Sequence, residues 1–134
     1  MKGPGQRFAD AAHSFLGVPF RLHGRCSIIG LDCVGLVHVS LAAIGRASKP
    51  PEGYRLRNLN PERWYKFAEA SGLKRTVGKP FIGDILLISP GPSQQHLIIV
   101  DSGSNAIHAH AGLGRVVRQP MEFQTAPIAH WRLI

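Results

Sequence analysis

The sequence predicts a single α+β domain in which helices come first and a mainly antiparallel β-sheet follows. Apolar residues recur at helical spacing in the first half, whereas short β-type runs separated by turn clusters fill the second half. The 15 Gly and 10 Pro residues argue against an all-helical bundle. Because 134 residues fit one domain with a sizeable hydrophobic core, we expect residues 1–134 to form one unit.

Three segments combine apolar residues at helical spacing with a stop signal at their C-terminal ends. These segments are residues 6–16, 33–44 and 60–71. Gly45 is expected to end the second helix. For the third helix, Asn60 is expected to be the N-cap, with Pro61 in the first turn and Glu62 near the positive end of the helix dipole. Residues 46–59 should form an exposed loop between these two helices.

Five short runs of mostly aliphatic residues are predicted to be β-strands. They are residues 83–88, 96–100, 106–109, 116–117 and 128–133. Turn clusters such as residues 89–92 and 101–105 separate them, which favours antiparallel pairing of neighbouring strands. Residues 23–30 are expected to be a loop that leads into the second helix.

The charge balance limits the kinds of partner that the protein can have. Lys and Arg number 16 against 8 Asp and Glu, and the net charge of +8 favours nucleic acid, a membrane surface or a polyanionic wall. No recognition helix, zinc finger or aromatic-basic motif is evident, so nucleic acid is not favoured. The sequence has neither a membrane-spanning apolar window nor the apolar core of a signal peptide at its N-terminus. We therefore expect synthesis in the cytoplasm without a signal peptide.

Cys33 is the most informative candidate for chemistry. A thiol in the first turn of a buried helix, directly after Asp32, lies where free backbone N–H groups and the helix dipole stabilise a thiolate. His96 opens one predicted strand and His108 ends the next, so antiparallel pairing would place them close together. A cysteine that faces two histidines has the geometry of a Cys/His/His triad. The alternative is that Cys33 is a small core residue.

Two further side chains could extend or compete with this site. His110 lies two residues after His108, so the three residues His96, His108 and His110 could ligate a metal ion. No fourth ligand appears at motif spacing, and a metal is not predicted. Cys26 lies in the loop before the second helix and is expected to be a bystander.

Five blocks, in order along the chain, resemble motifs of the NlpC/P60 cysteine peptidases. Residues 31–37 resemble the Asp-Cys-x-Gly-Leu/Phe-Val segment of that family, and residues 16–24 resemble its Gly-x-Pro-Tyr-x-x-Gly-Gly motif. Residues 83–85, 96–99 and 107–109 resemble its Gly-Asp strand start, its His-Val-x-Ile strand and its second histidine strand. Each block is weak alone, but order, spacing and chemical type agree over most of the chain.

The resemblance implies a papain-like α+β fold and hydrolysis of peptidoglycan stem peptides, typically at the bond that follows γ-D-glutamate. Carried over by position, Cys33 is the nucleophile, His96 is the general base and acid, and His108 orients His96. The resemblance implies no metal or organic cofactor.

The resemblance is closer still to the stand-alone NlpC/P60 domains of phage tails and phage-like particles, which carry a Pro- and Tyr-containing segment similar to residues 50–54. It implies assembly into a virion or phage-like particle tail, with tail proteins and peptidoglycan peptide as partners. Two alternatives stay open: a catalytically weakened structural or docking module of a tail tip, and an effector toxin aimed at a cell wall.

Four residues are predicted to bind substrate: Asp32, Phe20, Arg21 and Tyr54. Phe20 stands where the family usually has Tyr, and its ring cannot donate a hydrogen bond near the oxyanion, so slower turnover is expected. Asp32 could cap the helix or help to bind the amine of a stem peptide. Four arginines flank the expected entrance, as solvated surface or as contacts for substrate carboxylates: Arg21, Arg25, Arg55 and Arg57.

Overall fold

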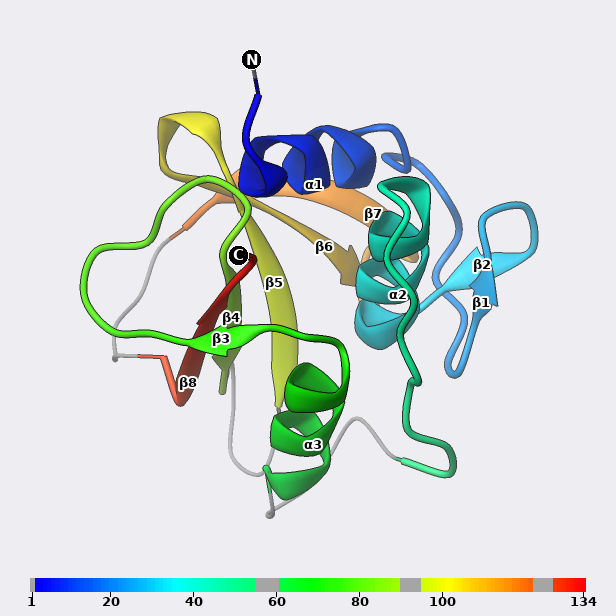
Figure 1. Ribbon diagram of the computed structural model, residues 1–134. Helices are drawn as coiled ribbons and strands as arrows, with labels where there is room; N and C mark the ends of the chain where they lie inside the picture. Colours follow the sequence, from blue (N-terminus) through cyan, green and yellow to red (C-terminus); the bar gives the residue numbers. More distant parts are fainter. Residues whose placement is uncertain (1, 55–60, 90–94, 122–126) are drawn as a thin grey trace.

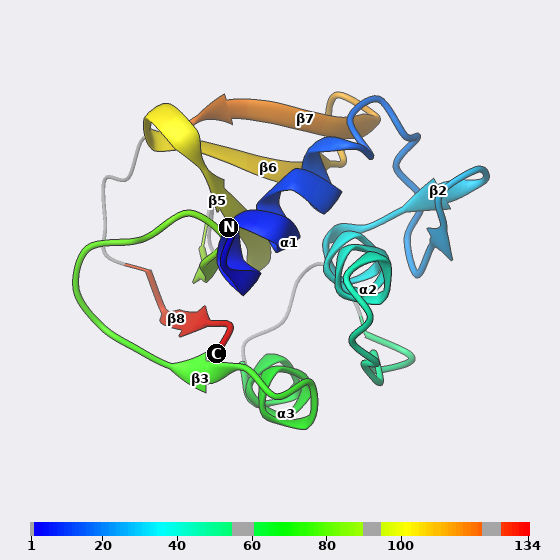
Figure 2. The same ribbon diagram turned by 45° about the horizontal axis from the view of Figure 1, so that its top comes forward.

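A computed structural model describes residues 2–54, 61–89, 95–121 and 127–134. Within these ranges three α-helices lie on one side of a six-stranded β-sheet (Figures 1 and 2). The helices are α1 (Pro4–His13), α2 (Cys33–Ala43) and α3 (Glu62–Ala70). Every pair of named strands is antiparallel, which confirms the predicted α+β class.

The described strands of the large sheet follow the order β3-β8-β4-β5-β6-β7. Their bounds are β3 (Lys74–Arg75), β4 (Ile85–Ile88), β5 (His96–Asp101), β6 (Asn105–His110), β7 (Arg115–Pro120) and β8 (Ala129–Arg132). A 3-10 turn, η1 (Ser102–Ser104), joins β5 to β6. A separate hairpin of β1 (Arg25–Cys26) and β2 (Gly30–Leu31) projects beside α2 (Figure 1).

Alternation along the central strands gives the sheet two apolar faces. The odd-numbered residues of β4 and β5 join the main core with the helices, and the even-numbered residues form a smaller cluster on the opposite face. The main core takes Ile85, Leu87, Leu97 and Ile99, and the smaller cluster takes Leu86, Ile98 and Val100. The apolar runs of β4 and β5 are therefore explained by burial on both sides of the sheet. Within the described ranges, no helix is both long and apolar enough to cross a lipid bilayer.

The ends of α2 agree with the sequence prediction. Asp32 is the N-cap, and its carboxylate accepts a hydrogen bond of 2.8 Å from the backbone N–H of Gly35. Gly45 adopts φ +82°, and the N–H of Arg46 bonds to the carbonyl of Leu41, so the helix ends in a left-handed turn. Both ends of the helix that carries Cys33 are thus set by local chemistry.

The start of α3 differs from the prediction. The N-cap is Pro61 rather than Asn60, which lies outside the described residues. The carbonyl of Pro61 accepts bonds from the N–H groups of Trp64 and Tyr65, so the first helical bonds begin there. Proline at this position has no N–H that would need a partner.

Three short strands were not predicted. The expected loop at residues 23–30 forms most of the β1–β2 hairpin, which ends at Leu31, and β3 lies in a segment with no strand pattern. Each of these strands has two residues, too few to show a period in the sequence.

A glycine contact brings the hairpin onto the first turn of α2. A Cβ on Gly35 would lie 1.9 Å from the carbonyl oxygen of Gly24 and 3.4 Å from the Arg25 guanidinium. Only a residue without a side chain allows the loop that carries His23 and Arg25 to reach Asp32.

We expect Gly35→Ala to destabilise the fold by more than about 2 kcal/mol, because the methyl group would clash with backbone. This loss would exceed the gain of about 1 kcal/mol in helix propensity. Urea denaturation measures it. Gly3→Ala is the matched control, since a Cβ there meets nothing within 4 Å. Equal stability of the Gly35 variant and wild type would contradict the close approach.

Candidate active site

The thiol of Cys33 lies at the N-terminal end of α2, against the start of β5. Its side chain belongs to the main core and the residue is only 2% exposed. The backbone N–H groups of Leu97, Val34 and Cys33 itself interact with the sulfur and act to lower its pKa. The contact with Leu97 places the sulfur one residue from His96 along β5.

These N–H groups do not produce a thiolate. Burial, followed by the negative charge of Asp32, raises the pKa of Cys33 from its ordinary value of 9.0 to about 12. The N–H groups at the helix N-terminus act in the direction that the sequence predicted, but burial and, after it, the charge of Asp32 outweigh them, so the thiol of the resting protein is neutral.

His96 and His108 are brought together by the pairing of neighbouring strands. Register between β5 and β6 runs from Ile99–Ile107 to Asp101–Asn105, and the two histidines lie beyond its end. Their rings still meet, with His96 Nε2 at 2.8 Å from His108 Nδ1. Because the Nε2 atom of His96 is occupied, Nδ1 is the nitrogen left to exchange a proton with a thiol.

Gln119 extends this pair and was not predicted. Its Oε1 atom lies 2.9 Å from His108 Nε2, so His96, His108 and Gln119 form a chain of hydrogen bonds across β5, β6 and β7. The sequence alone could not identify it, because only the structure shows the register in which β7 pairs Val117 with His108 and brings Gln119, two residues further along, to the same face.

Both histidines of this chain are held neutral. Burial, together with the neighbouring His108 and His110, lowers the pKa of His96 to about 3. Burial also lowers the pKa of His108. The resting site therefore holds a neutral thiol and two neutral imidazoles.

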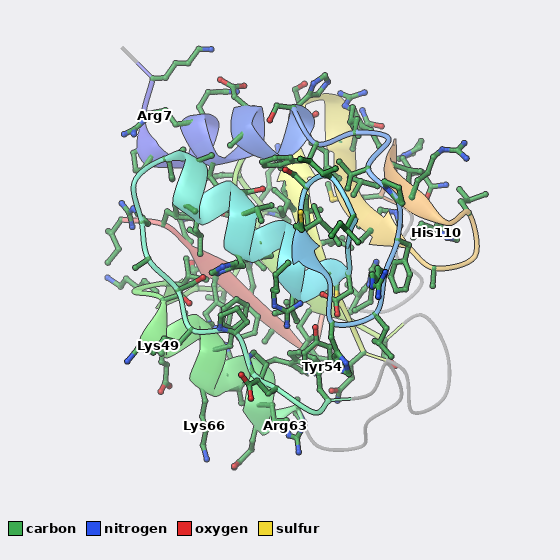
Figure 3. All side chains as sticks on the ribbon, turned by 90° about the vertical axis from the view of Figure 1, so that its right-hand side faces the viewer. Arg7, Lys49, Tyr54, Arg63, Lys66 and His110 are labelled. Atoms are coloured by element: carbon green, nitrogen blue, oxygen red, sulfur yellow. The ribbon has the colours of Figure 1, made fainter. Side chains whose placement is uncertain are left out.

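The Asp32 carboxylate is fully buried and receives four donors. They are the N–H of His23, the guanidinium of Arg25, the N–H of Gly35 and the hydroxyl of Tyr54. This occupancy favours the capping interpretation of Asp32. Tyr54 itself is buried. Burial raises the pKa of its hydroxyl most, and the hydrogen bond to Asp32 raises it further. Figure 3 shows Tyr54 close to the end of α2 that carries Cys33.

A buried path joins Asp32 to the strand of His96. The Tyr54 ring contacts Trp64 of α3 edge to face, with ring centroids 5.2 Å apart. The Trp64 indole donates a hydrogen bond of 2.5 Å to the buried side chain of Gln95, the residue before His96. The surroundings of Cys33 and of His96 are thus connected through α3.

The other residues that were predicted to bind substrate or to flank the entrance lie in different surroundings. Phe20 is half-buried against the main core, and its N–H bonds to the carbonyl of Gly114. Arg21 is exposed. Arg25 instead turns inward, to Asp32 and to the Tyr54 hydroxyl at 2.8 Å. Residues 55–60, which include Arg55 and Arg57, lie outside the described residues.

His110 lies beside the pair, as Figure 3 shows near the turn between β6 and β7. Its ring centroid is 5.4 Å from that of His108, and its Nδ1 accepts a bond from the N–H of Leu113. His108 uses both of its nitrogens for His96 and Gln119. In the described part of the chain, no three His, Cys, Asp or Glu side chains are arranged to hold a metal ion.

No protein-family model matches the sequence, and no curated protein matches it. Solved structures do resemble the fold. The NlpC/P60 domain of the peptidoglycan hydrolase SagA has a TM-score of 0.68 and 22% identity, over 98% of this chain and 100% of that domain. The peptidoglycan hydrolase RipB of Mycobacterium tuberculosis has a TM-score of 0.66 and 20% identity, over 97% of this chain and 64% of that one.

A third similar structure is NlpC1 from Trichomonas vaginalis, with a TM-score of 0.68 and 17% identity. The match covers 99% of this chain and 45% of NlpC1, so the chain spans less than half of that protein. The SagA domain is named an NlpC/P60 domain, and the chain has the NlpC/P60 fold that the sequence motifs predicted.

The two cysteines should differ sharply in reactivity. Cys26 is exposed, and the N–H groups of Ile29 and Ile28 lower its pKa, whereas Cys33 is buried with a raised pKa. We expect iodoacetamide at neutral pH to label Cys26 first, as read by peptide mass spectrometry. Cys26→Ser should leave only slow labelling. Faster labelling of Cys33 in the wild type would contradict the buried thiol.

Stability should fall with acid because His96 is buried in its neutral form. The pKa of His96 is about 3 in the folded state, so between pH 6.5 and 3 the unfolded state binds a proton that the folded state does not. His96 then removes about 2 kcal/mol of stability between pH 7.5 and 5.0. Urea denaturation should show a smaller pH effect in His96→Gln, while exposed His13→Gln behaves as wild type. An identical pH effect in both variants would contradict this.

Proposed function

We propose that the protein is a cysteine endopeptidase that hydrolyses peptidoglycan stem peptides, at the bond that follows γ-D-glutamate. The carrying observation is the Cys33 thiol at a helix N-terminus beside the strand that begins with the hydrogen-bonded His96 and His108. Similar folds occur in proteins that are named peptidoglycan hydrolases, SagA and RipB. The sequence motifs supply the bond specificity as an expectation.

The neutral resting site favours a mechanism in which proton transfer accompanies attack. The Cys33 sulfur attacks the peptide carbonyl while its proton moves to Nδ1 of His96. His96 then gives this proton to the leaving amine, and a thioester remains on Cys33. Water, losing a proton to His96, hydrolyses the thioester and restores the thiol. His108 holds the His96 ring through the bond to Nε2.

The N–H groups around Cys33 have a second use in this mechanism. The N–H groups of Cys33 and Val34 lie in the first turn of α2 and interact with the sulfur in the resting state. An oxyanion formed next to the sulfur would find these donors nearby. Phe20 offers no hydroxyl, so backbone donors carry more of this stabilisation than in relatives with Tyr.

The phage-tail or phage-like-particle setting is part of the proposal and is supported by the sequence resemblance, including residues 50–54. The net charge of +8 suits an anionic wall or an anionic tail partner. Mass spectrometry of purified particles from producing cells tests this setting. Particles that lack the protein would contradict the particle setting but would leave the peptidase proposal unaffected.

A structural or docking module of a tail tip with weakened catalysis is the second candidate. The observations that favour it are the 2% exposure of Cys33, its raised pKa and Phe20 in place of tyrosine. Such a module needs the fold and its surface but not the thiol. The two candidates therefore differ in whether the intact protein digests cell wall.

Digestion of purified peptidoglycan separates these candidates. We expect wild type to release fragments cut after γ-D-glutamate, identified by mass spectrometry, and EDTA to have no effect. Cys33→Ala should lower the rate by a factor of about 10⁴ or more. Cys26→Ala is the matched control and should digest normally. Undiminished digestion by Cys33→Ala would sink the thiol mechanism, and absence of digestion by wild type would favour the docking module.

A further inference from the structure

We propose that Gln119 is a positioning residue that sets the tautomers of both His108 and His96 and so keeps Nδ1 of His96 free to accept the thiol proton. This inference rests on the proposed peptidase function. It goes beyond the Cys33, His96 and His108 set by adding a residue on a third strand, β7.

The first step of the argument is the direction of the bond between Gln119 and His108. The Oε1 atom of Gln119 faces His108 Nε2 at 2.9 Å, and an amide oxygen can only accept a hydrogen bond. His108 Nε2 must therefore carry the proton. A neutral imidazole carries one proton, so Nδ1 of His108 is an acceptor.

The second step follows the chain to His96. Because His108 Nδ1 accepts, the His96 Nε2 atom at 2.8 Å must donate. Neutral His96 then has no proton on Nδ1, and that nitrogen can take the proton of Cys33. The lowered pKa values of both rings agree with this arrangement, since each ring is neutral at pH 7.

The reversed amide has the opposite consequence. If Gln119 presented its NH₂ group, His108 Nε2 would accept, His108 Nδ1 would donate to His96 Nε2, and the His96 proton would sit on Nδ1. The base would then be blocked, although every hydrogen bond would still be made. The orientation of one amide on β7 thus decides whether a ring two hydrogen bonds away can act as a base.

Gln119 is suited to this role by its place in the sheet. It is half-buried on β7, where it pairs with Ala106, and the diagonal neighbour on the same face is His108. His110 is a further ionisable side chain nearby, and it lowers the pKa of both His96 and His108. Its Nδ1 is engaged with the Leu113 N–H, so it does not compete for the nitrogens of His108.

Two substitutions separate positioning from packing. Gln119→Leu removes the acceptor at similar size, and we expect kcat to fall by about 10–100-fold, the range found when a hydrogen-bond partner that orients a metal-bound imidazole is removed. Gln119→Glu keeps an acceptor and has no NH₂ group that could turn toward His108. It should retain kcat within a few-fold of wild type, while its charge favours protonated His108 and moves the acidic limb of kcat/KM to higher pH. Gln6→Leu on α1 is the control for the same change elsewhere.

Nitrogen-15 NMR of the histidine rings tests the inference without any reaction. Wild type and Gln119→Glu should show the proton on Nε2 in both His96 and His108 at neutral pH, and Gln119→Leu should show a mixture. A proton on Nδ1 of His108 in wild type would overturn the proposal, as would unchanged tautomers and kcat in the Leu variant. If wild type digests no peptidoglycan but the tautomers follow the pattern, the peptidase proposal fails and the positioning inference stands.

If Gln119→Leu fails to fold, the wild-type tautomers and the pH profile of Gln119→Glu still decide the outcome. An acidic limb that does not move in the Glu variant would count against contact between residue 119 and the relay.

Discussion

The buried Asp32 carboxylate is the interaction on which the site depends. It caps α2, which carries Cys33, and the same two oxygens hold the hairpin through His23 and Arg25 and the following loop through Tyr54. Four donors stabilise one buried charge, as the low dielectric of the interior requires. The same negative charge raises the pKa of the neighbouring Cys33 thiol, because it opposes the formation of a thiolate.

The candidate site is held in place by two kinds of secondary structure. The position of Cys33 is fixed by a helix terminus and its cap, whereas the positions of His96 and His108 are fixed by the strands of the sheet. In the proposed mechanism, reactivity depends on a proton transfer between Cys33 and His96, which are both neutral at rest. Burial provides the dry surroundings in which directed hydrogen bonds have most influence.

The sequence allowed the helices, the longer strands and the adjacency of His96 and His108 to be predicted, because apolar period and turn clusters are local signals. It did not show that the Cys33 thiol would be buried with a raised pKa, since burial depends on segments far apart in the chain. The role of Gln119 in the hydrogen-bond chain needed the register of β6 and β7. The inward turn of Arg25 needed the close approach of the hairpin to Gly35, which spacing does not reveal.

The path from Asp32 through Tyr54 and Trp64 to Gln95 also has a consequence for how the fold opens. It connects the cap of α2 to the strand that begins with His96, through contacts that α3 provides. The two halves of the site therefore belong to one cooperative unit. Fluctuations that detach α3 would therefore loosen the surroundings of Cys33 and of His96 at the same time.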